Sequence, residues 1–172
     1  MRVYVASSWR CEHQPGVVQY LRSAGHEVYD FRHPAPEDRG FHWSEIDPAW
    51  QQWSAQGFRE GLDHEVAQAG FGKDMQALRD CDACVLVLPC GRSAHLELGW
   101  AVGASKLTAV LLTGFSEPEL MYRMVNAVCV STGEVLAWLA DEEQRIRAEQ
   151  DRNAPDVCQV FRPWFMNLAA RP

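Results

Sequence analysis

The sequence has no apolar run that approaches the ~20 residues needed to span a bilayer. Its first five residues predict a strand and offer neither the apolar core nor the cleavage site of a signal peptide. Histidine and cysteine residues do not recur at the spacing of a zinc site. We therefore expect a cytoplasmic protein with no membrane association and no bound metal.

Basic residues are scarce and dispersed. The chain has 16 Lys and Arg against 23 Asp and Glu, for a formal net charge of −7. A duplex nucleic acid requires a basic patch or stripe, so we expect no such partner. A small anion remains possible, because net charge does not decide the charge of a single pocket.

The six cysteines are scattered and lie mostly beside apolar residues, as is typical of reduced, buried thiols. Cys81 and Cys84 have the CxxC spacing of redox motifs. In a redox motif that pair follows a strand and opens a helix, whereas here it ends a helix and enters a strand. The context therefore argues against a redox or metal role.

Apolar stretches alternate with helical patterns along the chain. Strands are predicted at 2–6, 27–31, 83–89, 107–113 and 127–130, and helices at 14–24, 73–81, 94–104, 117–125 and 132–150. This alternation predicts a doubly wound α/β fold: a flavodoxin-like, five-stranded parallel sheet in the order 2-1-3-4-5, with helices on both faces. Ligands of such sheets bind at the carboxyl ends of the strands.

At 172 residues the chain is long enough for one domain and short for two. We predict a single α/β domain over 1–152 and a C-terminal tail over 153–172. Residues 32–71 are too long for a simple connection and are rich in aromatic side chains, which predicts an inserted lid or an additional helix.

The densest chemical signal follows the strand predicted at 83–89. A small polar loop leads into a helix that is expected to carry Glu97 in its first turn. In that position the helix dipole favours an ionised carboxylate by ~0.3–1 kcal/mol. Such a carboxylate at the ligand edge of a sheet is suited to nucleophilic attack. First-turn glutamates are also common for helix stability alone, so the residues by themselves leave both interpretations open.

Three short motifs resemble the nucleoside 2-deoxyribosyltransferase-like superfamily, which includes transferases and 5′-nucleotide N-glycosidases. Residues 93–101 contain the Glu-Leu-Gly-Trp-Ala core of its signature, and residues 3–10 are similar to its first strand and Ser-x-Arg loop. Asp74 resembles the aspartate that opens the helix before the third strand.

The resemblance implies that Glu97 attacks the anomeric carbon of a (deoxy)ribosyl group, and that water or a second base resolves the glycosyl-enzyme. It implies that Asp74 orients Glu97 or protonates the departing base. The alternative for Asp74 is an N-cap of the predicted helix. A homodimer is also implied, with the helix of Gly99 and Gly103 and the 153–172 tail as contact surfaces.

Four polar residues are candidates for binding an anion. Arg10 and Arg92 offer forked donors that fit phosphate oxygens, and the hydroxyls of Ser8 and Ser93 add to them near a helix N-terminus. Gly91 permits a tight loop between them. The alternative for both arginines is a solvated surface side chain.

Trp9, Trp43 and Tyr4 are candidates for stacking on a base, although tryptophans more often pack in a core. The loop Cys-Gly-Arg-Ser before Glu97 is basic, which favours a phosphorylated substrate over a free nucleoside. We therefore predict cofactor-free cleavage of the N-glycosidic bond of a (deoxy)nucleoside 5′-monophosphate, with release of free base. The alternatives are base exchange by a nucleoside 2-deoxyribosyltransferase, a TIR-like NAD glycohydrolase, and a non-catalytic nucleotide sensor.

Overall fold

The computed structural model describes residues 1–114 and 117–153. The strands are β1 (Arg2–Ala6), β2 (Glu27–Asp30), β3 (Ala83–Val87), β4 (Leu107–Leu111) and β5 (Ala127–Cys129). The helices are α1 (Gln14–Ser23), α2 (Ala55–Leu62), α3 (Glu65–Asp80), α4 (Arg92–Gly103) and α5 (Thr132–Asn153), with short 3₁₀ helices η1 (Trp43–Glu45), η2 (Trp50–Gln52) and η3 (Leu120–Met124). The chain divides into two compact units, 1–137 and 138–172. Apart from Asn153, the predicted tail lies outside the described residues.

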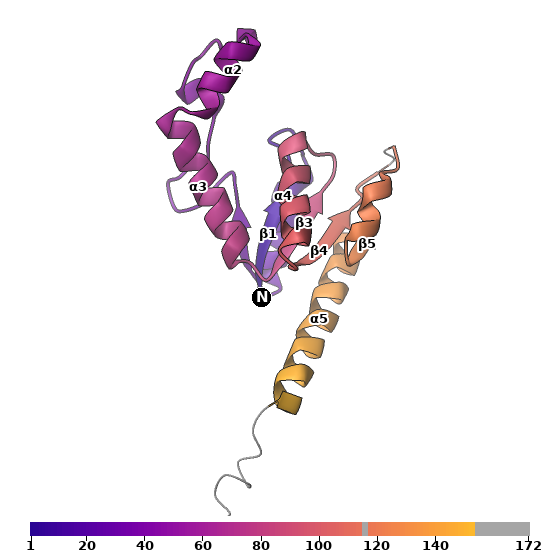
Figure 1. Cartoon of the computed structure of the whole chain (residues 1–172). Coiled ribbons are helices and arrows are strands. Elements are labelled where there is room, and N and C mark those ends of the chain that lie inside the picture. Colours follow the sequence, from indigo (N-terminus) through magenta and orange to yellow (C-terminus); the bar gives the residue numbers. More distant parts are fainter. Residues whose placement is uncertain (115–116, 154–172) are drawn as a thin grey trace, which may run out of the picture. The chain divides into compact units, whose positions relative to one another are not determined.

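The five strands form one parallel sheet in the order β2-β1-β3-β4-β5, which confirms the predicted flavodoxin-like order (Figure 1). Every residue of β3 is buried, as expected for a central strand covered on both faces. β3 ends at Val87, two residues before the predicted end. Pro89 has no N–H for the strand ladder, so the backbone leaves the sheet at this edge.

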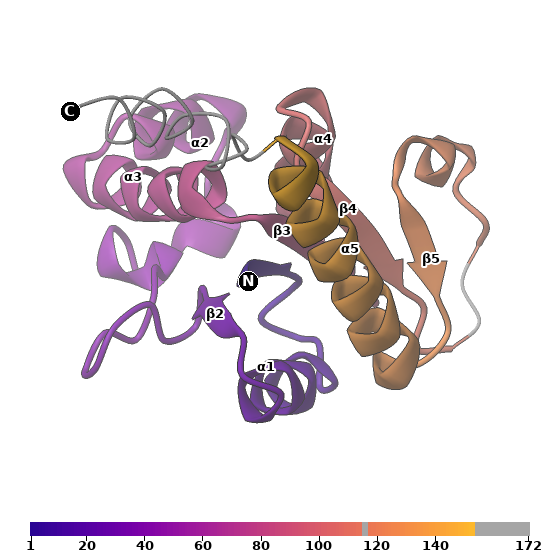
Figure 2. The same ribbon diagram turned by 90° about the horizontal axis from the view of Figure 1, so that it is seen from below.

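Helices cover both faces of the sheet, with α1 on one side and α3 and α4 on the other (Figure 2). On the α3 and α4 side, Leu78 and Leu98 pack against Tyr4 and Leu86 in one apolar cluster. Full burial of a leucine side chain contributes roughly 1.5–3 kcal/mol. This packing fixes the two helices that carry Asp74 and Glu97 against the same face of the sheet.

Two predicted helix starts are wrong. α4 begins at Arg92 with Gly91 as its N-cap, so Glu97 is its sixth residue and lies in the second turn. α3 begins at Glu65, where the His64 ring accepts a hydrogen bond from Val66 N, so Asp74 lies inside the helix rather than at its start. The segment 117–125, predicted as a helix, forms only the short η3.

The inserted segment 32–71 contains η1, η2, α2 and the first turns of α3. Its aromatic side chains pack on one another: the Trp43 ring lies 4.7 Å from Phe41, 5.7 Å from Trp53 and 6.3 Å from Phe58. At Gly61 an added Cβ would lie 2.4 Å from the Trp53 ring, so this close approach requires glycine. The segment therefore has an aromatic cluster of its own.

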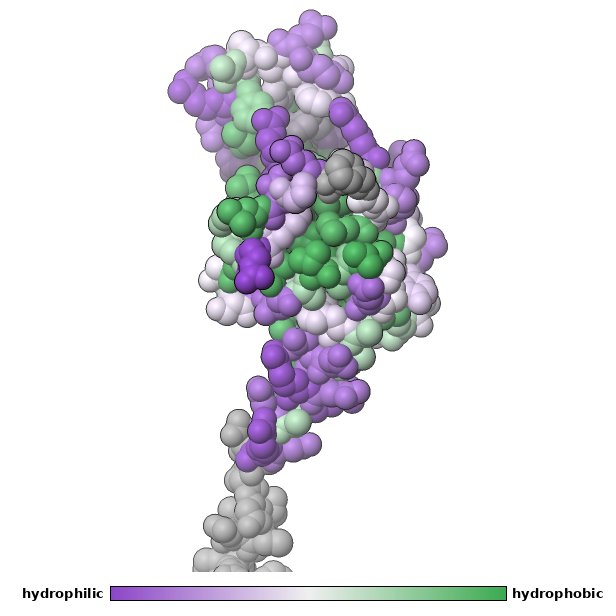
Figure 3. Space-filling view, turned by 90° about the vertical axis from the view of Figure 1, so that its right-hand side faces the viewer, coloured by the Kyte–Doolittle hydropathy of each residue, from purple (hydrophilic) through white to green (hydrophobic). Residues whose placement is uncertain are grey.

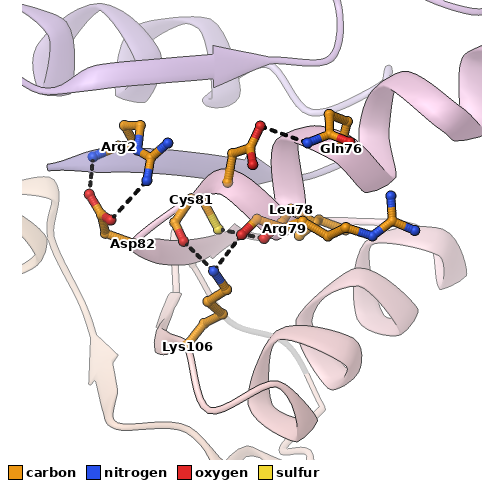
Figure 4. A network of polar contacts seen from close by, with 8 residues as sticks. Arg2, Gln76, Leu78, Arg79, Cys81, Asp82 and Lys106 are labelled. Carbon is orange, nitrogen blue, oxygen red and sulfur yellow. Dashed lines mark hydrogen bonds and ion pairs between the residues drawn. The ribbon is translucent and has the colours of Figure 1, made fainter.

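A polar network fixes the C-terminus of α3 at the amino edge of the sheet (Figure 4). Lys106 Nζ donates hydrogen bonds to the carbonyls of Arg79 and Cys81, at 2.6 and 2.7 Å. A cation at this end satisfies exposed carbonyls and opposes the negative end of the helix dipole. Arg2 N donates to Asp82 Oδ2 at 2.7 Å, which links the start of β1 to the start of β3.

Apolar side chains are exposed on η3 and at the edge strand β5, and an apolar area is visible on this side of the molecule (Figure 3). Leu120, Met121 and Met124 of η3 are exposed, and so are Val128 and Val130 at β5. Among the described helices, none is both long and apolar enough to cross a membrane.

Candidate active site

Two tyrosines form the sheet wall of the site. Tyr4 of β1 is paired in register with Tyr29 of β2 and with Cys84 of β3. Side chains paired across parallel strands project from the same face. The two tyrosine rings therefore stack, with centroids 5.2 Å apart and planes at 17°. Tyr4 has no exposed surface, so the prediction that it stacks on a base is wrong: it stacks on Tyr29.

Asp74 is a half-buried carboxyl on α3 that faces this wall. The Tyr29 hydroxyl donates to Asp74 Oδ1 at 2.8 Å. Burial raises the pKa of Asp74, while the Tyr29 hydrogen bond and the neighbouring Lys73 ammonium act in the opposite direction. An N-cap role is wrong because Asp74 lies inside α3. The side chain instead connects α3 to β2.

Glu97 is the second carboxyl of the site. Burial, together with repulsion from Asp74, raises the pKa of Glu97 to about 7. The expectation that the helix dipole holds this carboxyl ionised is wrong, because the dipole effect falls off beyond the first turn and Glu97 lies in the second. Both protonation states of Glu97 are therefore populated at neutral pH.

The Tyr4 hydroxyl lies beside Glu97. It is fully buried and makes no well-formed hydrogen bond with the described residues. The hydroxyl nevertheless lowers the pKa of the Glu97 carboxyl. The two groups are therefore close to each other, although their geometry does not meet the criteria of a hydrogen bond. A buried hydroxyl without a partner costs about 1–3 kcal/mol, and such exceptions in native proteins call for an explanation, a catalytic role among them.

The first loop, residues 7–13, connects β1 to α1 and lies at the carboxyl edge of β1. Ser8 Oγ accepts a hydrogen bond from Arg10 N at 3.2 Å, and the Arg10 side chain is exposed. Arg32 Nη2 donates to the carbonyls of Ser8 and Cys11, at 2.7 and 2.8 Å. Arg32 thus shapes this loop. Sequence reasoning missed it, because a lone arginine after a strand has no distinguishing pattern.

The N-terminus of α4 lies at the same edge. Ser7 Oγ donates to Val87 O at 2.8 Å, which ties the first loop to the end of β3. Arg92 and Ser93 are exposed in the first turn of α4, and no side chain caps that helix. Gly91 has a φ of −91°, and no atom lies within 4 Å of an added Cβ. Glycine permits this loop, as predicted, but the backbone there does not require it.

The two candidate tryptophans, Trp9 and Trp43, lie in different parts of the structure. Trp9 is 43% exposed, and its ring lies 5.4 Å from Phe31 and 4.2 Å from His42. It therefore remains at the carboxyl edge, where a ligand can reach it. Trp43 belongs to the aromatic cluster of the inserted segment, and its ring contacts place it in the packing of that cluster.

His95 links α4 to η3. Its Nδ1 lies 3.1 Å from Gly91 O and its Nε2 lies 2.9 Å from the Tyr122 hydroxyl. A carbonyl can only accept, so Nδ1 donates to Gly91 O. Cys90 Sγ is 3.4 Å from the same Nδ1, which carries the proton and therefore does not act as a base toward the thiol. Burial raises the pKa of Cys90 to about 11, which disfavours the nucleophilic thiolate form.

A cavity of about 200 Å³ opens beside Asp74 and Tyr29, between α3 and the inserted segment. Its walls combine aromatic and charged side chains. No group of three or more His, Cys, Asp or Glu side chains in the described part of the chain is arranged to hold a metal ion.

The similarity of this chain to known proteins was found among solved structures. No protein-family model matches the sequence, and no curated protein matches it. The solved structure of a 2-deoxyribosyltransferase from Bacillus psychrosaccharolyticus is 19% identical, aligns over 78% of this chain and 90% of that chain, and has a TM-score of 0.55. The CMP N-glycosidase BcmB of Clostridium botulinum is 17% identical over 81% of this chain and 99% of that one, with a TM-score of 0.45. From the first of these structures and the strand order, we conclude that this chain shares the fold of that 2-deoxyribosyltransferase.

Proposed function

We propose that the protein cleaves the N-glycosidic bond of a (deoxy)nucleoside 5′-monophosphate, with Glu97 as the nucleophile. The observation that carries this proposal is the pair of half-buried carboxyls, Glu97 and Asp74, at the carboxyl edge of the sheet. Each lies beside a tyrosine hydroxyl. Two coupled carboxyls of raised pKa provide one group to attack and one to transfer a proton.

In the first step an oxygen of ionised Glu97 forms a bond to C1′ while the C1′–N bond breaks. The electron pair of that bond stays on the base nitrogen, and protonated Asp74 supplies its proton. The two carboxyls share one proton, and the reactive form is the one in which Asp74 holds that proton while Glu97 is ionised. The products of this step are the free base and a glycosyl ester on Glu97.

In the second step a water oxygen attacks C1′ from the opposite face, and ionised Asp74 accepts the proton of that water. The bond between C1′ and the Glu97 oxygen breaks, and its electron pair restores the carboxylate. Both residues return to their starting protonation states. The sugar leaves with the configuration it had in the substrate, as in retaining glycosidases.

The phosphate of the substrate is assigned to the two loops at the carboxyl edge. Arg10 and Ser8 come from the first loop, and Arg92 and Ser93 from the open N-terminus of α4. Guanidinium forks and helix amides are the donors that phosphate oxygens prefer. Binding energy from this remote group can fix the sugar over Glu97. With the sugar held there, hydrolysis requires only an open route by which water reaches C1′.

One experiment separates the proposal from its alternatives. The purified protein is incubated with nucleoside 5′-monophosphates, their nucleosides and NAD, and free base is measured. Free base and ribose 5-phosphate, or its deoxy form, support the hydrolase. A labelled base that enters nucleoside or nucleotide as the main product identifies a transferase, nicotinamide release from NAD alone identifies an NAD glycohydrolase, and binding without turnover identifies a sensor.

We propose in addition a symmetric homodimer that packs α4 against its twin. Leu96, Gly99 and Gly103 are spaced by three and four residues, and therefore lie on one face of α4. Leu96 is 75% exposed, and no atom lies within 4 Å of an added Cβ at either glycine. The small residues leave room for another backbone to approach closely, and the exposed leucine supplies apolar area to bury.

A further inference from the structure

The cavity beside Asp74 adjoins the proposed proton donor. It is lined by Asp74 and Tyr29 on one side and by the inserted segment on the other. Asp74 lies close enough to Glu97 to raise the pKa of that carboxyl. A group bound in the cavity would therefore sit next to the proposed proton donor, and near the proposed nucleophile.

Two aromatic walls of the cavity are fixed in place. Phe31 and Phe41 line it. The Phe31 ring packs edge-on against Trp9 at 5.4 Å. The Phe41 ring packs against Trp43 at 4.7 Å, and an added Cβ at Gly70 would lie 2.9 Å from Phe41 Cβ. Fixed aromatic side chains that stack on a base contribute about 1–3 kcal/mol per base.

The polar groups of the cavity are mostly hydrogen-bond acceptors. Asp38 and Glu45 line it together with Lys73. Lys73 Nζ donates to Asp38 Oδ2 at 2.7 Å, and this bond is the main cause of the lowered pKa of Asp38, which stays ionised. Glu45 Oε1 accepts a hydrogen bond from the backbone N of His42 at 2.9 Å. Each carboxylate has lone pairs beyond those bonds.

We infer that this cavity is the subsite for the departing base, and that it selects bases whose edge carries an amino group over their keto counterparts. The inference rests on the proposed function. An amino group donates to the carboxylate oxygens of Asp38 and Glu45, whereas a carbonyl oxygen at the same place faces like partial charge and leaves the acceptors unpaired. Sites built to hydrogen-bond one substrate group discriminate strongly against analogues that lack it.

The test measures binding separately from turnover. In the Glu97→Gln variant, calorimetry compares cytidine with uridine 5′-monophosphate, and adenosine with inosine 5′-monophosphate. Within each pair the sugar and phosphate are identical. The amino member should bind at least ~10-fold more tightly in at least one pair, the difference expected when a hydrogen-bonding site is left unpaired.

A second substitution identifies the cavity as the source of this preference. Glu45→Gln keeps an oxygen that can accept from His42 N, yet replaces a carboxylate oxygen by a donor, so the amino preference should fall by at least ~5-fold. Glu60→Gln is the matched control, because Glu60 lies on α2 outside the cavity and contacts Gln56. That control should keep the full preference.

Each outcome decides one of the two proposals. Equal affinity for both members of each pair, or no binding of any of them, overturns the subsite. A preference that survives Glu45→Gln also overturns it. Amino-selective binding without base release by the wild-type protein leaves the subsite in place and removes the proposed hydrolysis. Base release by the wild-type protein without amino-selective binding overturns the subsite and leaves the proposed hydrolysis in place.

Discussion

Glu97 is the residue on which the proposed chemistry depends, and its carboxyl is costly to ionise in the folded protein. Glu97→Gln should fold normally and lose at least ~10³-fold in base release, as is typical when one member of a catalytic unit is removed. Turnover like that of the wild type would eliminate Glu97 as the nucleophile. Because the reactive form needs ionised Glu97 and protonated Asp74, wild-type base release should fall as the pH rises above about 7, where the pair loses its shared proton.

The same variant should change stability in a pH-dependent way. The pKa of Glu97 is about 7 in the folded protein and 4.5 without perturbation, a difference equivalent to at most about 3 kcal/mol. The protonated form is the one the fold prefers. The free-energy cost of holding an ionised Glu97 in the folded protein is therefore absent below pH 4.5. It grows between pH 4.5 and 7 and is complete above pH 7. Glu97→Gln should melt at a higher temperature than the wild type at pH 8, and near the same temperature at pH 4.

Asp74 should affect the reaction through the proton that it shares with Glu97. Asp74→Asn keeps an oxygen that can accept from the Tyr29 hydroxyl, yet removes the repulsion that helps to raise the pKa of Glu97. Without a shared proton, the variant should lose the fall in rate above about pH 7, while the maximal rate falls by about 10²-fold with the loss of a proton donor. Asp80→Asn on the same helix is the control. An unshifted profile with a lowered melting temperature would indicate a structural role alone.

At the scale of elements, the first loop and the start of α4 should act together on the phosphate. Arg10→Ala should lower kcat/KM for a nucleoside 5′-monophosphate by about 10²-fold, because a charge-assisted hydrogen bond contributes about 1.5–3 kcal/mol. The matching nucleoside, which has no phosphate, should lose little. Steady-state kinetics on the two substrates measure the difference, and an equal loss on both would contradict a phosphate contact.

Helix α4 also carries the proposed dimer contact. Gly103→Leu adds a large side chain on the open face of α4, where no atom lies within 4 Å of the Cβ position. It should leave the monomer folded and turn the dimer into a monomer in light scattering at micromolar concentration. Gly72→Leu is a matched control on α3, since the Cβ position of Gly72 is equally open.

Two results would contradict that interface. A wild-type protein that is monomeric at micromolar concentration removes the dimer altogether. A dimer that survives Gly103→Leu but dissociates with Leu120→Glu would place the contact on the exposed apolar side chains of η3 and β5 instead. Large exposed apolar patches commonly mark protein interfaces.

At the scale of the whole molecule, much of the architecture could be predicted from local patterns. Continuous apolar runs marked β1, β3 and β4, and the helical patterns between them implied parallel crossovers, because parallel strands need such connections. The strand order followed from that alternation and is confirmed. The motif around Glu97 placed this residue on the helix that follows β3, where the structure also has it, although one turn further along the helix than predicted. Helix starts were less predictable, because neither α3 nor α4 begins with a strong capping residue.

The electrostatic state of the site was decided by tertiary structure alone. Local sequence places Glu97 on a helix, but its pKa depends on burial and on Asp74, which belongs to another helix. The contact between Tyr4 and Tyr29 depends on the register of β1 against β2, and Asp74 reaches Tyr29 only because α3 packs on that face. Periodicity in a sequence records which side of an element is buried. Desolvation and charge coupling depend on the groups that pack against the buried side. For this site those groups come from segments that are distant along the chain.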